Sequence, residues 1–149
     1  MLHGLDTGFL VAAEVKEHTH YAAARATLTR LIAAGDLIAI APQVLAELIH
    51  IVTDARRFSQ PLDMTSAIQI AEQWWTAKEV LQVFPDDAAG RQFLVWLRQF
   101  SLGRKRLLDT LLAATYHEVG IQSLLTTNAA DFAVFGVFTC VTPSPKVTP

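Results

Sequence analysis

The chain has one cysteine, few charges and no long apolar run, and each shortage excludes a class of protein. Cys140 is the only cysteine in 149 residues, so no disulfide can form within the chain. Its place in the apolar run VFTCV indicates a buried strand residue rather than a nucleophile. No stretch of about 20 apolar residues is present to span a bilayer. The first residues, MLHGLD, have no basic segment followed by an apolar core, so we expect no signal peptide and a cytoplasmic location.

Charged residues make up only 17% of the chain, against 52% hydrophobic residues, which predicts a folded globular protein rather than a disordered one. The net charge is -2, so the chain has no overall positive charge that could hold a nucleic acid by bulk electrostatics. A polyanion would need a local patch, and the densest basic run is GRKR, residues 103–106. We expect one domain over residues 1–142 and a Pro-rich tail over residues 143–149.

What is present is an alternation of apolar runs of strand length with helical patterns. Strands are predicted over residues 1–6, 36–41, 79–85, 123–127 and 137–141. Helices are predicted over residues 8–34 with a break near 17–19, then over 42–57, 64–77, 86–100 and 107–119. Residues 128–136 are predicted as a turn. Because the strands are apolar without alternation, the pattern predicts an α/β layer fold around a mostly parallel sheet.

The stretch LDTGFL, residues 5–10, allows two opposed interpretations. Asp-Thr-Gly between apolar residues is the active-site triplet of aspartic proteases. Those enzymes are rich in β-structure and need a second aspartate from another lobe or chain, whereas this triplet leads directly into a helical pattern. The alternative places Asp6 at the carboxyl end of the first strand, where open α/β sheets put their sites. The helical context favours a site acid over a protease dyad.

Two helices carry an acid at the margin of their apolar face. At about 100° per residue, the face predicted for the helix from Pro42 comprises Val44, Leu45, Leu48, Ile49, Ile51 and Val52. The face predicted for residues 107–119 comprises Leu108, Leu111, Leu112, Thr115 and Val119. Glu47 borders the first face and Asp109 the second. Taken alone, Glu47 can be a solvated flank and Asp109 a first-turn acid favoured by the helix dipole.

A fourth acid follows a strand in LLTTNAADF. Asn128 and Asp131 stand after this strand as Asp6 stands after the first. Helix capping explains them too, with Asn128 as the N-cap and Asp131 as a first-turn acid. With Asp6, Glu47 and Asp109, Asp131 makes four acids, each at the same structural position in a separate strand–helix unit. Capping does not explain this recurrence.

The four settings LDTGFL, LAELI, LLDTLLAATYHEVGI and LLTTNAADF resemble the PIN domain, and within it the VapC-type toxins of bacterial toxin–antitoxin pairs. The resemblance extends over about residues 2–142, and its most specific part is the last two motifs together. It implies a three-layer α/β/α fold with a five-stranded, mostly parallel sheet. It also implies a divalent metal, Mg²⁺ or Mn²⁺, endonucleolytic cleavage of RNA, a homodimer and a cognate antitoxin.

The resemblance also implies which acids are catalytic. Asp6 matches the first-strand acid, Glu47 the helix glutamate and Asp109 the acid that opens the Leu-Ala-Ala helix. Asp6, Asp109 and Asp131 are expected to form the metal site, with Asp6 and Asp109 as direct ligands. Glu47 and Asp131 would hold metal-bound waters, or one of them would take a proton from the attacking water. A divalent metal would neutralise the phosphodiester and acidify water, and Mg²⁺ prefers such oxygen ligands. The sequence does not separate these roles, nor one metal from two.

Three further polar residues belong to the expected site. Relatives place the fourth acid either where Asn128 stands or where Asp131 stands. Only Asp131 is acidic here, so Asn128 is assigned as an auxiliary ligand or a residue that positions water. The hydroxyls of Thr7 and Thr126 lie within reach of the site, although each can instead cap backbone.

The basic run directly precedes Asp109, so Arg104, Lys105 and Arg106 are expected to bind RNA phosphates beside the acids. A short basic loop can also be merely solvated. A pair of histidines would support cleavage without a metal, but the five histidines share no phase and do not favour that mechanism.

Two other functions stay open at this point. One is a PIN-fold module that binds RNA or protein without catalysis, and the other is a housekeeping RNA-processing nuclease without an antitoxin. Trp74 and Trp75 bear on partners, since neighbouring helix residues point about 100° apart. One of them can therefore lie in the core while the other is more exposed. The pair indicates packing at the strand edge or, alternatively, a protein-binding surface.

Overall fold

The computed structural model describes residues 1–143 and is built around one five-stranded sheet. The strands are β1 (Leu2–Leu5), β2 (Leu37–Ile40), β3 (Val80–Gln82), β4 (Ser123–Leu125) and β5 (Thr139–Val141), in the order β3-β2-β1-β4-β5. Every neighbouring pair is parallel, which confirms the predicted parallel sheet. The chain runs outward from β1 in both directions, so the space between β1 and β4 is a topological switch point. Open α/β sheets bind ligands outside the carboxyl ends of strands at such a point.

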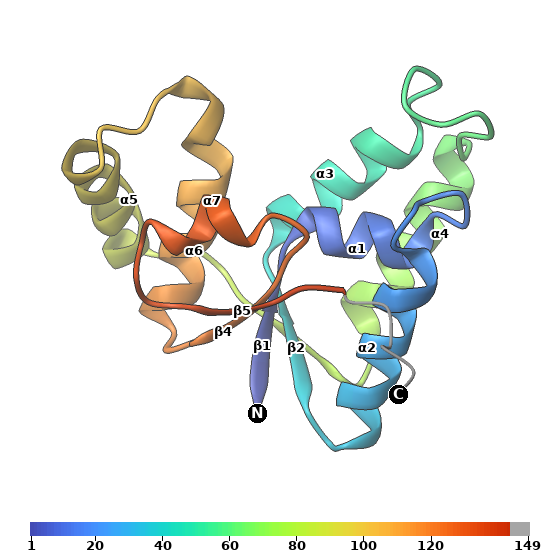
Figure 1. The fold of residues 1–149 in the computed structure, drawn as a ribbon, viewed down its shortest axis with the longest axis horizontal. Helices are drawn as coiled ribbons and strands as arrows, with labels where there is room; N and C mark the ends of the chain where they lie inside the picture. The colour runs from blue at the N-terminus through green and yellow to red at the C-terminus, as the bar shows by residue number, and fades with distance from the viewer. Residues whose placement is uncertain (144–149) are drawn as a thin grey trace, which may run out of the picture.

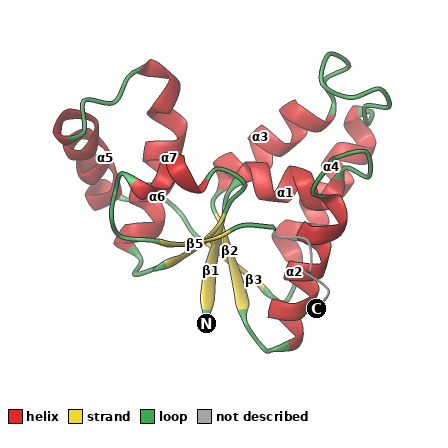
Figure 2. Ribbon diagram, in the orientation of Figure 1, coloured by secondary structure: helices red, strands yellow, loops and turns green. Residues whose placement is uncertain are grey.

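Helices flank the sheet in two groups, which confirms the predicted α/β architecture (Figure 1). The first group is α1 (Thr7–Glu14), α2 (Tyr21–Ala33), α3 (Pro42–Val52) and α4 (Met64–Thr76). The second is α5 (Asp87–Gln99), a single 3-10 turn η1 (Arg104–Arg106), α6 (Leu107–Glu118) and α7 (Ala129–Ala133). Figure 2 shows the strands gathered between the two groups of helices.

The central strand β1 is locked to α6 through Gly4 and Tyr116. A Cβ atom on Gly4 would lie 2.7 Å from the Tyr116 ring, so only glycine allows the ring to lie against the strand. The Tyr116 hydroxyl reaches the carbonyl oxygens of Leu5 at 2.7 Å and Ala39 at 3.1 Å. Burial raises the pKa of this hydroxyl, which therefore remains a neutral donor. The contact fixes α6, which carries Asp109, relative to the ends of β1 and β2.

Helix α3 ends at Val52, so the prediction of a helix through residue 57 is wrong. The Thr53 hydroxyl donates to the carbonyl of Ile49 at 2.7 Å, and the Asp54 carboxylate accepts from the backbone N–H of Arg56 at 2.9 Å. Short polar side chains of this kind bind local backbone groups and turn the chain out of a helix.

The apolar face of α6 also differs from the prediction. Leu108 and Val119, both predicted to be in the core, are 55% and 49% exposed. The predicted face omits three residues that are buried in the structure, Ala113, Ala114 and Tyr116. The predicted Leu112 and Thr115 are buried as well. The cause is that α6 packs on two sides, against β1 through Tyr116 and against α5. The buried surface is therefore wider than one stripe and centred on different residues.

Smaller differences concern the last turn of α4 and the end of the chain. Trp74 and Trp75 are both half-buried and both pack against the core. The predicted turn over 128–136 contains the short helix α7, and Cys140 lies half-buried on β5. Apart from Pro143, the predicted tail lies outside the described residues. Within residues 1–143, no helix has the length and apolar character needed to cross a membrane.

Candidate functional site

Four carboxylates from four separate elements influence one another at the carboxyl edge of the sheet. Asp6 follows β1, Glu47 lies on α3, and Asp109 and Asp131 lie in the first turns of α6 and α7. The charges of Asp109 and Glu47 each raise the pKa of Asp6, and the charge of Asp131 raises the pKa of Asp109. Asp6, Glu47 and Asp109 therefore lie near one another, and Asp131 lies near Asp109; we call these four residues the acidic cluster.

Asp6 is the most buried acid of the cluster, with 7% of its surface exposed. Its backbone N–H donates to the carbonyl of Leu125 at 2.9 Å, and the Thr126 hydroxyl donates to its Oδ2 atom at 2.8 Å. Burial is the largest effect on this carboxyl and raises its pKa from 3.8 to about 7, against the lowering effect of the Thr126 hydrogen bond. Asp6 therefore changes protonation near neutral pH.

Glu47 is held by Gln43, one turn earlier on α3. The Gln43 side-chain amide donates to Oε1 of Glu47 at 3.2 Å and to the carbonyl of Leu108 at 3.0 Å, so it links α3 to α6. Burial raises the pKa of Glu47, with Asp109 adding to the shift. Sequence reasoning missed Gln43, although its i,i+4 spacing from Glu47 is a detectable signal.

Asp109 is half-buried and lies beside a cation. Burial raises its pKa, whereas the guanidinium of Arg106 lowers it. Nε of Arg106 lies 3.9 Å from Oδ2 of Asp109, and the same guanidinium donates to the backbone carbonyl of Asp131. Of the basic run expected to bind RNA, Arg104 and Lys105 are exposed, whereas Arg106 is turned toward the acids.

The three auxiliary residues differ in what they contact. Thr126 has two roles, because its hydroxyl donates to Asp6 and also accepts from the backbone N–H of Asn128 at 3.0 Å. Asn128 stands at the N-cap position of α7, but its exposed side chain makes no capping hydrogen bond. The Thr7 hydroxyl is buried and has no hydrogen-bond partner among residues 1–143, although it lies near enough to lower the pKa of Glu47.

Gly8 is a second residue that sequence reasoning missed. A Cβ atom here would lie 2.6 Å from the Thr127 hydroxyl oxygen and 3.9 Å from Oδ2 of Asp6. The missing side chain therefore lets the loop between β4 and α7 approach the start of α1. LDTGFL contains this glycine, but the sequence does not show which loop it would meet.

The chemistry of these residues fits a hydrated divalent cation. Within residues 1–143, no three His, Cys, Asp or Glu side chains stand in a geometry that could hold an ion by themselves. Mg²⁺ does not need such a cage, because it commonly keeps several waters and binds one or two carboxylates directly. The clustered carboxylates supply hard oxygen ligands, and the buried Thr7 hydroxyl supplies an unused polar atom beside them.

A buried histidine network occupies the opposite edge of the sheet. Nδ1 of His3 lies 2.6 Å from Oγ of Ser123, and Nε2 lies 2.9 Å from Oδ2 of Asp36. This Ser–His–Asp arrangement joins β1, β4 and the segment before β2. Because His3 and Ser123 are 3% and 7% exposed, the arrangement ties strands together and offers a substrate no surface.

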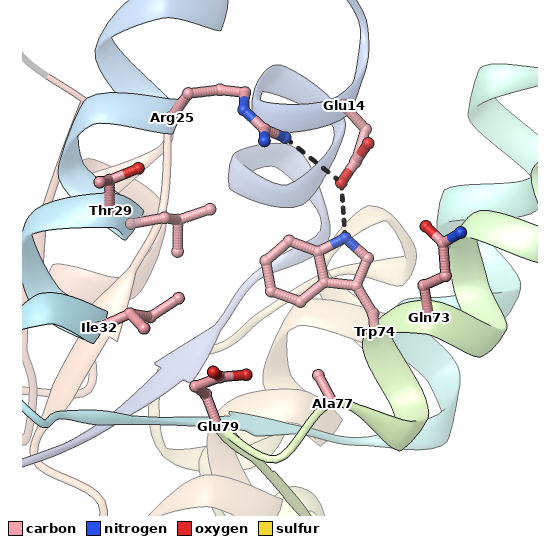
Figure 3. Close-up of a pocket in the computed structure, with 9 residues that line it drawn as sticks. Glu14, Arg25, Thr29, Ile32, Gln73, Trp74, Ala77 and Glu79 are labelled. Atoms are coloured by element: carbon pink, nitrogen blue, oxygen red, sulfur yellow. Dashed lines mark hydrogen bonds and ion pairs between the residues drawn. The ribbon is translucent and has the colours of Figure 1, made fainter.

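A separate cavity of about 270 Å³ lies between α2 and α4 (Figure 3). Nε1 of Trp74 donates to Oε1 of Glu14 at 2.7 Å, and the Arg25 guanidinium lies 3.7 Å from the same oxygen. Figure 3 shows the Trp74 ring facing Thr29 and Ile32 of α2. None of the four clustered acids lines this cavity, so it is distinct from the acidic cluster.

Comparisons with known proteins identify the family and the fold of the chain. Residues 5–136 match the PIN domain family. VapBC2 from Rickettsia felis, solved with a DNA fragment from its promoter, has a TM-score of 0.70 and 21% identity over 97% of this chain and 100% of that chain. VapC20 from Mycobacterium tuberculosis, a toxin that cleaves the sarcin-ricin loop, has a TM-score of 0.63 and 19% identity over 83% of this chain and 87% of that chain.

A toxin–antitoxin complex from Klebsiella pneumoniae gives a TM-score of 0.63 and 17% identity, covering 95% of this chain and 98% of that chain. A comparison with curated protein sequences gives no match. At these identities the solved structures show a shared fold.

Proposed function

The chain belongs to the PIN domain family, and from that premise we propose that it is a metal-dependent endoribonuclease that hydrolyses RNA phosphodiester bonds. One observation carries the proposal: the buried carboxyl of Asp6 lies at the switch point of the sheet, within the electrostatic influence of Glu47 and Asp109. Concentrating negative charge in this way costs stability, and a bound cation offsets that cost. If these acids had only a structural role, no bound cation would offset the cost of their mutual repulsion.

We propose that Asp6, Asp109 and Asp131 hold Mg²⁺ or Mn²⁺. A divalent cation bound there would neutralise charge on the phosphodiester and make a water molecule more acidic. Thr126 orients Asp6 through its 2.8 Å hydrogen bond. Thr7, whose hydroxyl is buried, and Asn128, which is exposed, are the proposed auxiliary oxygen donors.

Glu47 is the proposed acceptor of the proton from the attacking water. Its pKa is raised by burial, which makes its carboxylate a stronger base than a solvated glutamate. Gln43 holds one carboxylate oxygen and leaves the other available. We propose that Arg104 and Lys105, which are exposed immediately before α6, contact RNA phosphates that flank the scissile bond.

We further propose that the enzyme is the toxin of a toxin–antitoxin pair and acts as a homodimer. The fold shared with the VapC20 toxin and with the Klebsiella pneumoniae toxin–antitoxin complex supports the role as a toxin. Expression of the wild-type chain in a bacterium is expected to arrest growth, whereas expression of Asp6→Asn is not. Growth without arrest, combined with RNA cleavage by the purified protein, would favour a housekeeping nuclease.

Cleavage of mixed cellular RNA by the purified protein tests the proposed activity. With Mn²⁺ or Mg²⁺, the wild-type protein is expected to yield discrete fragments that disappear in EDTA. Intact RNA in every metal, together with an unchanged melting temperature, would contradict the proposal. That result would favour a non-catalytic PIN-fold module that binds RNA or protein.

A further inference from the structure

Arg106 is the residue whose position the proposed RNA contacts do not explain. Its side chain is 25% exposed, although the two basic residues before it are exposed. Its backbone is fixed at both groups, because its N–H donates to Gly103 at 2.9 Å and its carbonyl accepts from the Thr110 hydroxyl at 2.6 Å. The main chain is thus fixed at the entry to α6, and the guanidinium lies against Asp109 and the backbone carbonyl of Asp131.

The guanidinium makes one firm contact and one loose contact. It donates to the backbone carbonyl of Asp131, which ties it to the start of α7. Toward Asp109 the Nε–Oδ2 distance is 3.9 Å, too long for a hydrogen bond. The Nε atom is itself buried and has no hydrogen-bond partner within residues 1–143.

This arrangement differs from that of a structural salt bridge. Buried polar groups that serve stability are hydrogen-bonded in nearly all cases, and an arginine–carboxylate pair usually forms two parallel bonds. Here the positive charge of Arg106 lies close to Asp109, at 3.9 Å from Nε to Oδ2, while the carboxylate accepts no hydrogen bond from Arg106. Asp109 is thus partly neutralised and still able to bind a second cation.

We propose that Arg106 is an internal counter-ion that competes with the divalent metal for Asp109 and so sets the metal affinity of the site. The inference rests on the proposed function, because it takes Asp109 as a metal ligand. With no metal bound, Arg106 offsets part of the repulsion among the carboxylates. When a metal binds, the like charges of the ion and the guanidinium oppose each other, so the cation must bind against Arg106.

Titration of the metal-free protein with Mn²⁺ by calorimetry tests this competition. Removing the charge in Arg106→Gln is expected to tighten Mn²⁺ binding by about tenfold, since the pair is only partly shielded from water. Arg106→Lys keeps the charge and is expected to stay within about twofold of wild type. Arg104→Gln removes the same charge from the exposed start of the run and is the matched control, also within about twofold.

Thermal unfolding supplies the second readout. Without metal, Arg106→Gln is expected to melt below wild type, because the carboxylates lose their counter-charge. With saturating Mn²⁺, its melting temperature is expected to rise by more than that of wild type. If Arg106→Gln does not fold, Arg106→Met retains the aliphatic packing of the side chain and serves the same test.

The possible failures are distinguishable. If wild type binds Mn²⁺ and the uncharged Arg106 variants bind it equally or more weakly, the counter-ion inference is overturned and the proposed function is not. Equal tightening in Arg104→Gln would also overturn it, because the effect would then be general charge. If wild type binds no Mn²⁺ at all, the proposed metal site fails and this inference fails with it.

Discussion

The hydroxyl of Thr126 donates a 2.8 Å hydrogen bond to Oδ2 of Asp6, joining the residue that follows β4 to the residue that follows β1. A second bond, from the backbone N–H of Asp6 to the carbonyl of Leu125 at 2.9 Å, runs beside it. The two bonds close the switch point of the sheet and fix the most buried acid of the cluster. The Thr126 bond favours the ionised form of Asp6, whereas burial favours the neutral form.

Thr126→Val removes this donor while keeping the shape of the side chain. We expect the pKa of Asp6 to rise further above its ordinary value, Mn²⁺ binding to weaken by about tenfold, and the free energy of unfolding to fall by about 1–2 kcal/mol. Thr126→Ser keeps the hydroxyl and is the control. Calorimetry and urea unfolding provide the two measurements, and unchanged Mn²⁺ affinity in the valine variant would show that the bond does not position Asp6 for metal.

Asp6→Asn isolates the pH dependence that Asp6 gives to stability. Its folded pKa is about 7 against 3.8 as the ordinary value, so between these values the folded protein holds a proton that the unfolded chain has released. The stabilising contribution of Asp6 is therefore complete below about pH 4 and is lost as the pH rises through 7. In metal-free urea unfolding, the stability of Asp6→Asn relative to wild type should grow over this window by up to about 4 kcal/mol. If the difference in stability between Asp6→Asn and wild type does not vary with pH, the claim that burial raises the pKa of Asp6 is contradicted.

Metal binding should release a proton from Asp6. A cation binds the ionised carboxylate, so we expect Mn²⁺ affinity to rise between about pH 5 and pH 7 and to level off above that range. Titration at pH 6 in buffers with different ionisation enthalpies measures the protons released for each ion bound. Asp6→Asn should lose most of this release together with affinity. Equal release from both proteins would assign the proton to another group.

Gly4→Ala tests the packing that holds α6 against β1. The added methyl would lie 2.7 Å from the ring of Tyr116, which is fully buried and bonded through its hydroxyl, so we expect a loss of about 1–3 kcal/mol. Gly90→Ala in α5 is the control, because a Cβ atom there meets no atom within 4 Å. Alanine should stabilise that helix by up to about 1 kcal/mol. Chemical denaturation of both variants measures the contrast, and similar changes in the two would contradict the packing argument.

The order of the strands and of the longer helices was predictable because each carries its own local pattern, whereas the short α7 was predicted as a turn. The apolar run at residues 36–41 predicts a strand without reference to the rest of the chain, and Pro42 predicts the helix start that follows. The end of α3 was not predictable, because Thr53 and Asp54 stop the helix through side-chain hydrogen bonds to nearby backbone groups. The width of the buried face on α6 depends on a second neighbour, α5, which no periodicity reveals.

The residues of the candidate site also divide into those that could be proposed from the sequence and those that could not. The four acids could be proposed from the sequence because each stands at a strand end or at the margin of a helix face. Gln43 and Gly8 could not, since their roles depend on contacts with Leu108 and Thr127 across the fold. The direction of Arg106 was equally hidden, because the basic run gives its charge but not which of its members turns inward.

The most direct test of the account is the single-turnover rate of RNA cleavage in saturating Mn²⁺, measured for wild type and for amide replacements of the clustered acids. The replacements are Asp6→Asn, Glu47→Gln, Asp109→Asn and Asp131→Asn. The control is Asp87→Asn, an acid on α5 whose side chain is 81% exposed. We predict that each of the four slows cleavage by more than about a hundredfold, while the control keeps the wild-type rate. Cleavage at the wild-type rate by Asp6→Asn or Asp109→Asn would contradict the central claim that these carboxylates form the catalytic metal site.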